Sequence, residues 1–175
     1  MDDSAALRVA LRPYSSADAA ATLAVFTDAI TQTASAHYTP EQIEAWARPG
    51  RRDLPAWDEA MSGRGSIVAV AGDEVVGFSD VGQDGYIDML FVSPRHVRRG
   101  IARSLLAFIE SRARSSGIAE LTSDVSVAAR LFFESVGFEI VREQRPIKEG
   151  VALTNFRMRK LLTGGSVALS APRRR

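Results

Sequence analysis

Hydrophobic and polar residues follow two different periods along this chain, and the changes of period mark its predicted elements. Runs in which apolar residues alternate or cluster over a few positions predict strands at residues 7–11, 67–71, 75–81, 86–92, 121–125, 138–141 and 151–158. Apolar residues three or four apart predict helices after residue 15 and over residues 39–46, 53–61, 100–117 and 127–136. This order predicts an α/β fold in which a mixed sheet carries helices on both faces.

Capping residues support several of these boundaries. Thr39, Pro40 and Gln42 form a predicted capping box, in which proline occupies the first helical position. Asp53 is a predicted N-cap of the next helix, and Gly137 a predicted C-terminal cap of the helix 127–136. The helices therefore have sequence support beyond their periodicity.

A basic turn with one glycine joins the strand 86–92 to the helix that follows. The first N–H groups of a helix lack intrahelical acceptors and carry partial positive charge, which suits a phosphate. Gly100 allows the backbone to approach a ligand closely. We expect a polyphosphate to bind to backbone N–H groups and positive charge in the segment Arg98, Arg99, Gly100, Ile101, Ala102 and Arg103.

Two short signatures resemble those of the GNAT superfamily of acyl-CoA-dependent N-acyltransferases. Residues 97–102 resemble motif A, Q/R-x-x-G-x-G/A, with Val97 departing from it. Residues 126–138 resemble the second signature, N-x-x-A-x-x-F-Y-E-x-x-G-F, with Ser126 and Phe133 in the usual Asn and Tyr positions. The resemblance covers roughly residues 6–161. Residues 38–47, 121–126 and 150–155 are also similar to a bacterial subgroup of small acetyltransferases.

The resemblance implies a GNAT fold, with a mostly antiparallel central sheet in which the motif-A strand splays from its neighbour. It implies acetyl-CoA as co-substrate, with the pantetheine arm in the gap and paired with the backbone of Leu90, Phe91 and Val92. Ser126 is either a contact beneath that arm or a simple helix N-cap. Ala129 and Phe132 of the second signature complete the predicted cofactor-binding set.

The acceptor amine must lose a proton when it attacks the thioester, and a carboxylate near the donor could take it. Asp88 is the first candidate, because burial on the motif-A strand would raise the pKa of its carboxyl group; a purely structural role is the alternative. Tyr86 shares its face of the strand, and Asp124 is the second carboxylate near the predicted acyl gap.

The resemblance also implies a proton donor for the departing thiolate at the usual Tyr of the second signature, where this chain has Phe133. Either another group such as Tyr86 or Tyr38 donates the proton, or the thiolate leaves unassisted, which its pKa near ~8.5 allows. For Phe133 itself we expect core packing.

The predicted acceptor site includes Tyr38 and Trp46, whose rings could hold a cationic amine or could simply pack in the core. The acceptor is expected to be a small-molecule amine or a peptide amine. A small cationic amine fits the aromatic and acidic residues slightly better.

Length, composition and charge limit the possible domain organisation, ligands and cellular location of this protein. We expect one domain over residues 1–162 and a flexible tail over residues 163–175, within a chain of 175 residues. A net charge of +1 gives no reason to expect nucleic-acid or membrane binding. The absence of cysteine excludes disulfides and an acyl-cysteine thioester intermediate, and with only two histidines we expect no catalytic metal. No apolar run approaches the ~18 residues of a membrane-spanning helix, and the N-terminus shows no signal-peptide pattern, so we expect a cytoplasmic protein. Many proteins of this fold form homodimers, and we expect the same here.

These observations predict an N-acetyltransferase that moves an acetyl group directly from acetyl-CoA to an amine. The alternative is a non-catalytic acyl-CoA-binding or sensing module on the same fold, which the phenylalanine in the usual acid position keeps open.

Overall fold

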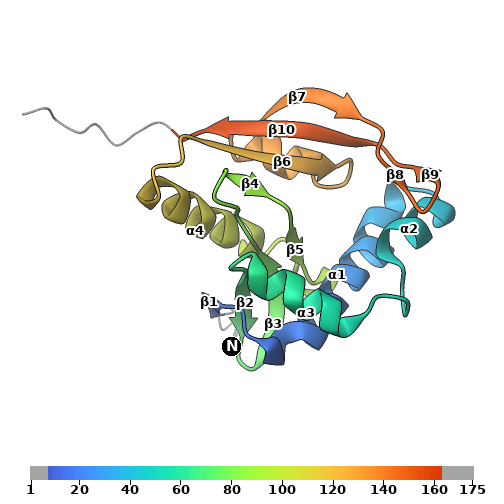
Figure 1. Cartoon of the computed structure of the whole chain (residues 1–175), viewed down its shortest axis with the longest axis horizontal. Coiled ribbons are helices and arrows are strands. Elements are labelled where there is room, and N and C mark those ends of the chain that lie inside the picture. Colours follow the sequence, from blue (N-terminus) through green and yellow to red (C-terminus); the bar gives the residue numbers. More distant parts are fainter. Residues whose placement is uncertain (1–7, 163–175) are drawn as a thin grey trace, which may run out of the picture.

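Two four-stranded sheets diverge from a common region and leave a wedge between them (Figure 1). The computed structural model describes residues 8–162. The first sheet has the order β1 (Val9–Pro13), β2 (Ile67–Ala71), β3 (Glu74–Ser79) and β5 (Leu90–Val92). The second has the order β4 (Tyr86–Ile87), β6 (Glu120–Ser126), β10 (Asn155–Leu161) and β7 (Glu139–Gln144). Within these sheets, β4 and β6 form the parallel pair and the other neighbours are antiparallel.

Helices cover both faces of the first sheet, as the sequence predicts. Ile67 and Ala69 of β2 pack in one core with α4 (Ile101–Ser115), whereas Val68 packs in the other core with α1 (Ala19–Asp28) and α3 (Leu54–Gly63). This division follows from the period of two along a strand. A π-helical turn (Ala29–Thr33) extends α1 toward α2 (Pro40–Ala47), and α5 (Arg130–Ser135) packs with the second sheet. Short 3₁₀ turns span Ser16–Asp18, Ala34–Ala36 and Pro94–His96.

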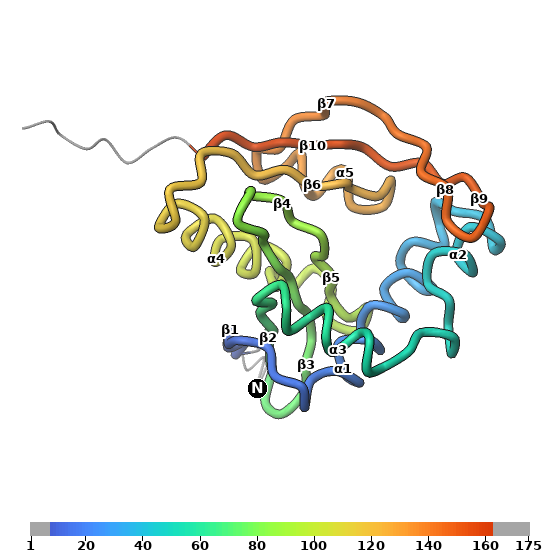
Figure 2. Tube along the Cα trace, viewed as in Figure 1, coloured from blue at the N-terminus to red at the C-terminus, as the bar shows by residue number. Residues whose placement is uncertain are grey.

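The predicted strand 86–92 is not continuous, and this corrects the sequence interpretation. Its first part, β4, pairs with β6, and its last part, β5, pairs with β3 (Figure 2). At the break, the carboxylate of Asp80 accepts hydrogen bonds from the N–H groups of Asp88 (2.9 Å) and Met89 (3.2 Å). The bonds that would continue a ladder are thus taken by a side chain from the end of β3, and the chain crosses from one sheet to the other.

Other predicted boundaries also shift. The helix expected at 127–136 begins only at Arg130, because residues 127–129 form a turn in which Ser126 Oγ accepts a hydrogen bond from the Ala129 N–H (3.2 Å). The strand expected at 151–158 divides into β9 (Val151–Ala152) and β10, and β9 forms a hairpin with β8 (Ile147–Lys148). The capping box at Thr39 and the N-cap at Asp53 are both confirmed.

The described part of the chain contains no helix that is long and apolar enough to cross a membrane. The first residues of the strand predicted at 7–11 and the tail predicted at 163–175 fall partly or wholly outside the described residues.

Candidate functional site

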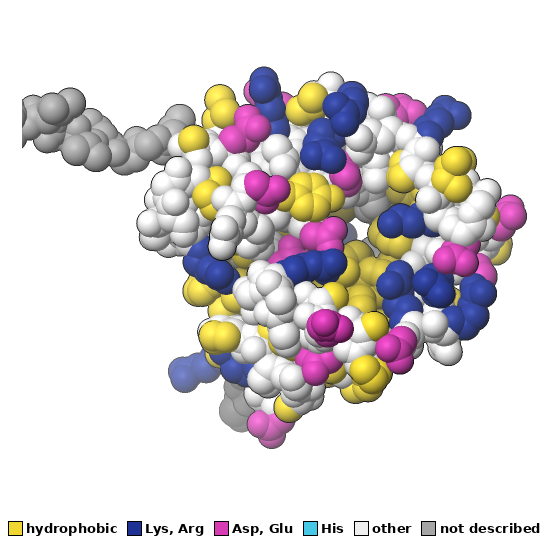
Figure 3. Space-filling view, viewed as in Figure 1, with side chains coloured by type: hydrophobic (Ala, Val, Ile, Leu, Met, Phe, Trp, Pro, Cys, Tyr) yellow, Lys and Arg dark blue, Asp and Glu magenta, His cyan; other side chains and the backbone are white. Residues whose placement is uncertain are grey.

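A cleft of about 610 Å³ occupies the wedge between the two sheets. Figure 3 shows this face of the molecule hollowed at its centre, with apolar side chains inside the opening and charged ones around it. At one end the cleft reaches the start of α4, at Val97 and Ala102. It passes between β5 and the end of β6, and its other end is lined by Tyr38, Trp46, Arg52 and Lys148. We call the first end the helix end and the second the aromatic end.

Among residues 8–162, no strand pairs with the edge of β5 that faces the cleft. On the opposite edge, the Asp80 N–H donates to the Met89 carbonyl (3.2 Å) and the Ser93 N–H donates to the Val76 carbonyl (2.9 Å). Because antiparallel ladders alternate, the N–H and C=O groups of Phe91 also point toward β3, and those of Leu90 and Val92 point toward the cleft. Two of the three backbone positions predicted to pair with a ligand are therefore available.

Phe91 is the exception, and its predicted backbone role needs correction. Its peptide groups belong to the ladder with β3. Its ring packs in the core against Phe26 (centroids 5.0 Å apart) and Phe78 (5.7 Å), and it contributes a side-chain wall to the cleft. Alternation along the ladder determines which residues of β5 bond to β3. The sequence alone does not show whether Phe91 or its neighbours make these bonds.

The start of α4 has the open, basic character that the sequence predicts. Gly100 is the N-cap with φ +80°, and its carbonyl accepts the first helical bond, from the Ser104 N–H at 2.9 Å. The N–H groups of Ile101, Ala102 and Arg103 therefore lack intrahelical acceptors. Apart from its two chain neighbours, no described residue has an atom within 4 Å of where a Cβ on Gly100 would be, so a ligand could approach there.

Several arginines surround this helix start, and three of them have no acidic partner among residues 8–162. The side chains of Arg98, Arg99 and Arg103 are exposed and form no ion pair with any residue in the range 8–162. Arg98 also has a positive φ of 62°, an uncommon conformation for a residue with a side chain. This positive charge is free to interact with an anion.

The opposite wall of the cleft comes from the second signature. Ser126, Ala129 and Phe132 line it. Ser126 Oγ accepts the Ala129 N–H and so closes the turn before α5, whose own N-cap is Ala129; it is not the helix N-cap that the sequence offered as an alternative. Phe133 is 3% exposed and makes edge-on contacts with Phe132 and Phe138, which confirms the prediction of core packing.

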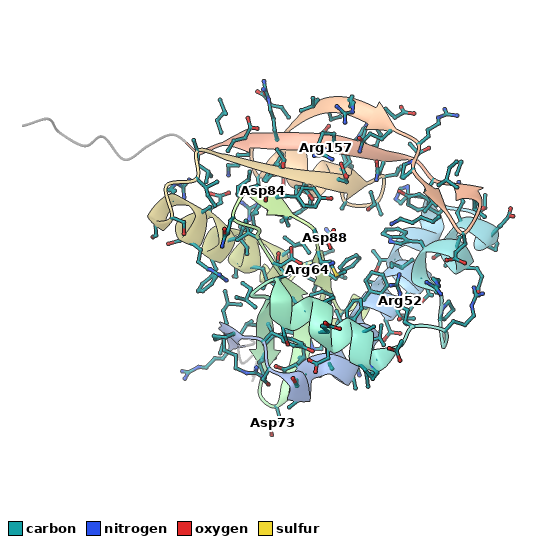
Figure 4. The ribbon with its side chains drawn as sticks, viewed as in Figure 1. Arg52, Arg64, Asp73, Asp84, Asp88 and Arg157 are labelled. Atoms are coloured by element: carbon teal, nitrogen blue, oxygen red, sulfur yellow. The ribbon has the colours of Figure 1, made fainter. Side chains whose placement is uncertain are left out.

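Asp88 lies at the mouth of the cleft, and the expectation that it is buried is wrong. Its side chain is 36% exposed, and its Oδ2 lies 2.8 Å from Arg64 Nη1 (Figure 4). The break between β4 and β5 explains this, because it turns Asp88 out of the ladder. Arg64 itself comes from the end of α3, a partner that strand periodicity does not reveal.

Asp80 is the buried carboxylate of this region, with 1% exposure. Burial raises the pKa of Asp80 to about 6, although the two N–H donors at the strand break favour its charged form. It lines a second hollow beside Arg64, outside the main cleft. Its role is to hold the strand break. One indication of this role is present in the sequence, namely an aspartate directly after an apolar strand.

Asp124 is the centre of a hydrogen-bond network. Its carboxylate accepts bonds from Arg157 (2.6 and 3.1 Å), Gln144 (2.7 Å) and the Tyr86 hydroxyl (3.2 Å). With both oxygens occupied by donors, this carboxylate anchors its neighbours. Sequence reasoning missed Arg157 and Gln144, which lie on β10 and β7 and are brought together only by the strand order.

Burial and then the charge of Asp124 raise the pKa of Tyr86 to about 12. The guanidinium of Arg157 also lies over the Tyr86 ring, 5.4 Å from its centroid. Tyr86 is thus held in place with its proton firmly bound.

Tyr38 and Trp46 meet at the aromatic end, with ring centroids 5.4 Å apart. The Tyr38 hydroxyl donates to the Thr154 carbonyl (2.6 Å) and accepts from the Val127 N–H (2.9 Å). Burial raises the pKa of Tyr38. Sequence reasoning missed the basic residues Arg52, Arg64 and Lys148, which also line the cleft.

Among residues 8–162, no group of three or more His, Cys, Asp or Glu side chains is placed to hold a metal ion.

Comparison with known proteins agrees with this architecture. Residues 34–160 match the family model described as an acetyltransferase (GNAT) domain. This chain belongs to the GNAT acetyltransferase family. An uncharacterized N-acetyltransferase of Escherichia coli, YafP, is 41% identical to this GNAT chain over 153 residues, covering 86% of this chain and 95% of YafP.

Two solved structures illustrate the shared fold. A GCN5-related N-acetyltransferase from Rhodopseudomonas palustris superposes with a TM-score of 0.83 at 34% identity, over 87% of this chain and 94% of that one. The PaiA N-acetyltransferase from Thermoplasma acidophilum, solved in complex with coenzyme A, gives a TM-score of 0.68 at 20% identity, over 88% and 99% of the two chains. The predicted GNAT fold, with mixed sheets and a splayed strand pair, is therefore confirmed.

Proposed function

We propose that this GNAT chain transfers an acetyl group from acetyl-CoA directly to a primary amine. One observation carries the proposal: the same cleft joins the edge of β5, which pairs with no strand among residues 8–162, to the start of α4, where the N-cap Gly100 has no side chain to cover the first N–H groups. The first can pair with an amide-containing arm and the second can bind a pyrophosphate. That the PaiA structure contains coenzyme A on the same fold supports the assignment.

The donor is held by groups at fixed positions along the cleft. The N–H groups of Ile101, Ala102 and Arg103 bind the pyrophosphate, with Arg98 and Arg99 beside them. Leu90 and Val92 pair with the pantetheine arm, and the Leu90 N–H polarises the thioester carbonyl. Ser126, Ala129 and Phe132 form the opposite wall.

The proton of the amine passes to Asp88 or to water at the mouth of the cleft. Asp88 is exposed there and its pairing with Arg64 fixes its position. Asp124 has a different task, because its oxygens are occupied; it positions Tyr86.

In this proposal the thiolate leaves without a tyrosine acid. Phe133 has no proton to give. Tyr86, with a pKa of about 12, would protonate a thiolate of pKa ~8.5 only uphill, by about 5 kcal/mol. A thiolate of that pKa is a sufficient leaving group by itself.

The second candidate, a non-catalytic acyl-CoA-binding module, is favoured by this same lack of a proton donor. The two candidates differ in one measurable property. Over a panel of small amines and peptides, an enzyme releases CoA from acetyl-CoA in proportion to the amine added, whereas a binding module releases none. The proposed acceptor is an amine of a small molecule or of a peptide, so the panel contains both.

The donor site is tested by placing a negative charge where the pyrophosphate is proposed to bind. Ala102→Glu adds a carboxylate in the first turn of α4, which repels a phosphate but suits the helix dipole. We expect acetyl-CoA to bind at least about 10-fold more weakly by calorimetry, while the unliganded variant melts at the wild-type temperature or slightly above it.

Ala107→Glu is the matched control, because Ala107 is exposed on the same helix and does not line the cleft. It should bind acetyl-CoA as the wild type does. Equal weakening by both variants, or none by Ala102→Glu, would contradict the proposed donor site.

The homodimer and the cytoplasmic location that the sequence suggested stay predictions.

A further inference from the structure

Three arginines lie close together in and after the turn between α2 and α3, and they differ in their partners. Arg48 Nη1 lies 3.6 Å from Glu149 Oε1, and Arg51 Nη2 lies 2.8 Å from Glu44 Oε1. Arg52 lines the cleft and forms no ion pair with any residue that the structure describes. In Figure 4 it lies across the opening from Arg64 and Asp88. A partly buried cation without a carboxylate partner is costly, so a role for it is expected.

The guanidinium of Arg52 is held in one orientation by its own surroundings. Its Nε donates to the Ala47 carbonyl (3.0 Å) and its Nη2 to the Trp46 carbonyl (2.8 Å). Its Cζ also lies over the Phe26 ring, 4.5 Å from the ring centroid. These contacts use one edge of the planar fork, and Nη1 makes no hydrogen bond with residues 8–162. The free edge, formed by Nη1 and the second N–H of Nη2, matches the two oxygens of a carboxylate.

The charges around the cleft point to the same chemistry. The carboxylates that line it, Asp88 and Asp124, are already paired with Arg64 and Arg157. Arg52 and Lys148 line the aromatic end without such partners among the described residues. Arg52 also covers the Phe26 ring, which is therefore not free for a cationic ligand.

We propose that the amine acceptor carries a carboxylate, and that the free edge of Arg52 binds it at the aromatic end of the cleft. This rests on the proposed function. The substrate class is then an amine-bearing carboxylic acid, such as an amino acid, with an apolar body that fits the surface of Trp46 and Phe91. The carboxylate is bound at one end, and the amine is left to reach the acyl group at the edge of β5.

The test compares amines that differ only at the carboxylate. Amino acids, their primary amides and the corresponding decarboxylated amines are assayed for CoA release, and their binding to the CoA-loaded protein is followed by calorimetry. Phosphoethanolamine and ethanolamine form a second matched set. We expect acids to be preferred over amides, and Arg52→Met to raise the KM for the acid about 10- to 100-fold with acetyl-CoA binding unchanged.

Arg51→Met is the matched control, because Arg51 is exposed, pairs with Glu44 and does not line the cleft. The ratio of acid to amide turnover within one variant is insensitive to how much of it folds, so a loss of stability in Arg52→Met does not obscure the result. We expect that ratio to collapse in Arg52→Met, to fall partly in Arg52→Lys and to stay unchanged in Arg51→Met.

Equal use or equal binding of acids and amides by the wild type overturns the proposal, as does a preference for phosphoethanolamine over every carboxylate. Normal acetyl-CoA binding in the same experiment would leave the proposed acetyl transfer standing. Failure of acetyl-CoA to bind would instead remove the proposed function itself.

Discussion

Asp80 and Asp18 are both buried carboxylates, yet their surroundings move their pKa values in opposite directions. Asp18 accepts two hydrogen bonds from Arg12 and others from Ser15, and these lower the pKa of its carboxyl group to about 2. Asp80 has two backbone donors, but burial dominates and raises the pKa of its carboxyl group to about 6. The Asp18 contribution to stability is therefore lost as the pH falls from ~4 toward 2, whereas Asp80 weakens the fold as the pH rises from ~4 to 6.

Replacement of Asp80 by asparagine tests whether ionisation of Asp80 lowers the stability of the fold. Asparagine keeps an oxygen for the N–H groups of Asp88 and Met89 but does not ionise. A pKa that moves from 3.8 to about 6 corresponds to about 3 kcal/mol. We expect the free energy of unfolding of Asp80→Asn, relative to the wild type, to rise by up to that amount between pH 4 and pH 7, in urea titrations.

Asp73→Asn is the control for this series, because Asp73 is exposed at the tip of the β2–β3 hairpin. Its stability should follow the wild type at every pH. If the stability curves of Asp80→Asn and the wild type run parallel from pH 4 to pH 7, the pKa of Asp80 is not raised in the folded protein.

At the scale of elements, the pairing of β5 predicts a hydrogen-exchange rate for each of its amides. The N–H groups of Phe91 and Ser93 bond to β3, and those of Leu90 and Val92 face the cleft. In the free protein we expect rapid hydrogen exchange at Leu90 and Val92 and slow exchange at Phe91 and Ser93. Acetyl-CoA should slow exchange at the first two and leave the other two as they were, when measured by NMR.

Alternate residues of one strand thus serve as their own controls. Slow exchange at Leu90 and Val92 without ligand would mean that this edge is already paired. Uniform slowing at all four positions on addition of acetyl-CoA would indicate general stabilisation, with no pairing specific to the edge.

Elements with local signals were predictable from the sequence, and the strand break was not. Thr39, Gln42 and Asp53 mark their helices through bonds to residues three positions away. The break at Asp88 depends on a carboxylate eight residues earlier in the chain, at the end of another strand. The apolar run 86–92 therefore looks like one strand, although its two parts belong to different sheets.

On the scale of the whole molecule, Tyr38 connects parts of the chain that are far apart in sequence. Its hydroxyl bridges Val127, in the turn after β6, and Thr154, before β10. Tyr38→Phe leaves one N–H and one carbonyl without a partner in a largely buried place. We expect the free energy of unfolding to fall by about 1–3 kcal/mol, which lowers the melting temperature by several degrees.

Tyr14→Phe is the comparison, since the Tyr14 hydroxyl makes a single bond, to Asp58 at 2.8 Å, and Tyr14 does not line the cleft. It should cost less than Tyr38→Phe in thermal unfolding. An equal or smaller loss for Tyr38→Phe would show that the bridge contributes little to the fold.

The same scale explains which parts of the candidate site could be predicted. The helix start at Gly100 and the wall at Ser126, Ala129 and Phe132 are contiguous in sequence, so short motifs reveal them. The partners of Asp88 and Asp124 come from α3, β7 and β10, and strand order alone brings them together. Arg52 was missed because nothing near it in the sequence marks it as different from Arg48 and Arg51.

The wedge also bears on how the open edge of β5 is protected from pairing with a strand of another copy of this protein. Exposed edges are prone to pair with other chains, and outer edges are commonly protected by charge or proline. Here the outer strand β1 ends in Arg12 and Pro13, and the outer strand β7 carries Glu139, Arg142 and Glu143. The edge of β5 is Leu-Phe-Val and has no such protection. This edge lines the cleft, and we expect the opposite wall at Ser126, Ala129 and Phe132 to hinder the approach of a second sheet while leaving room for a narrow ligand.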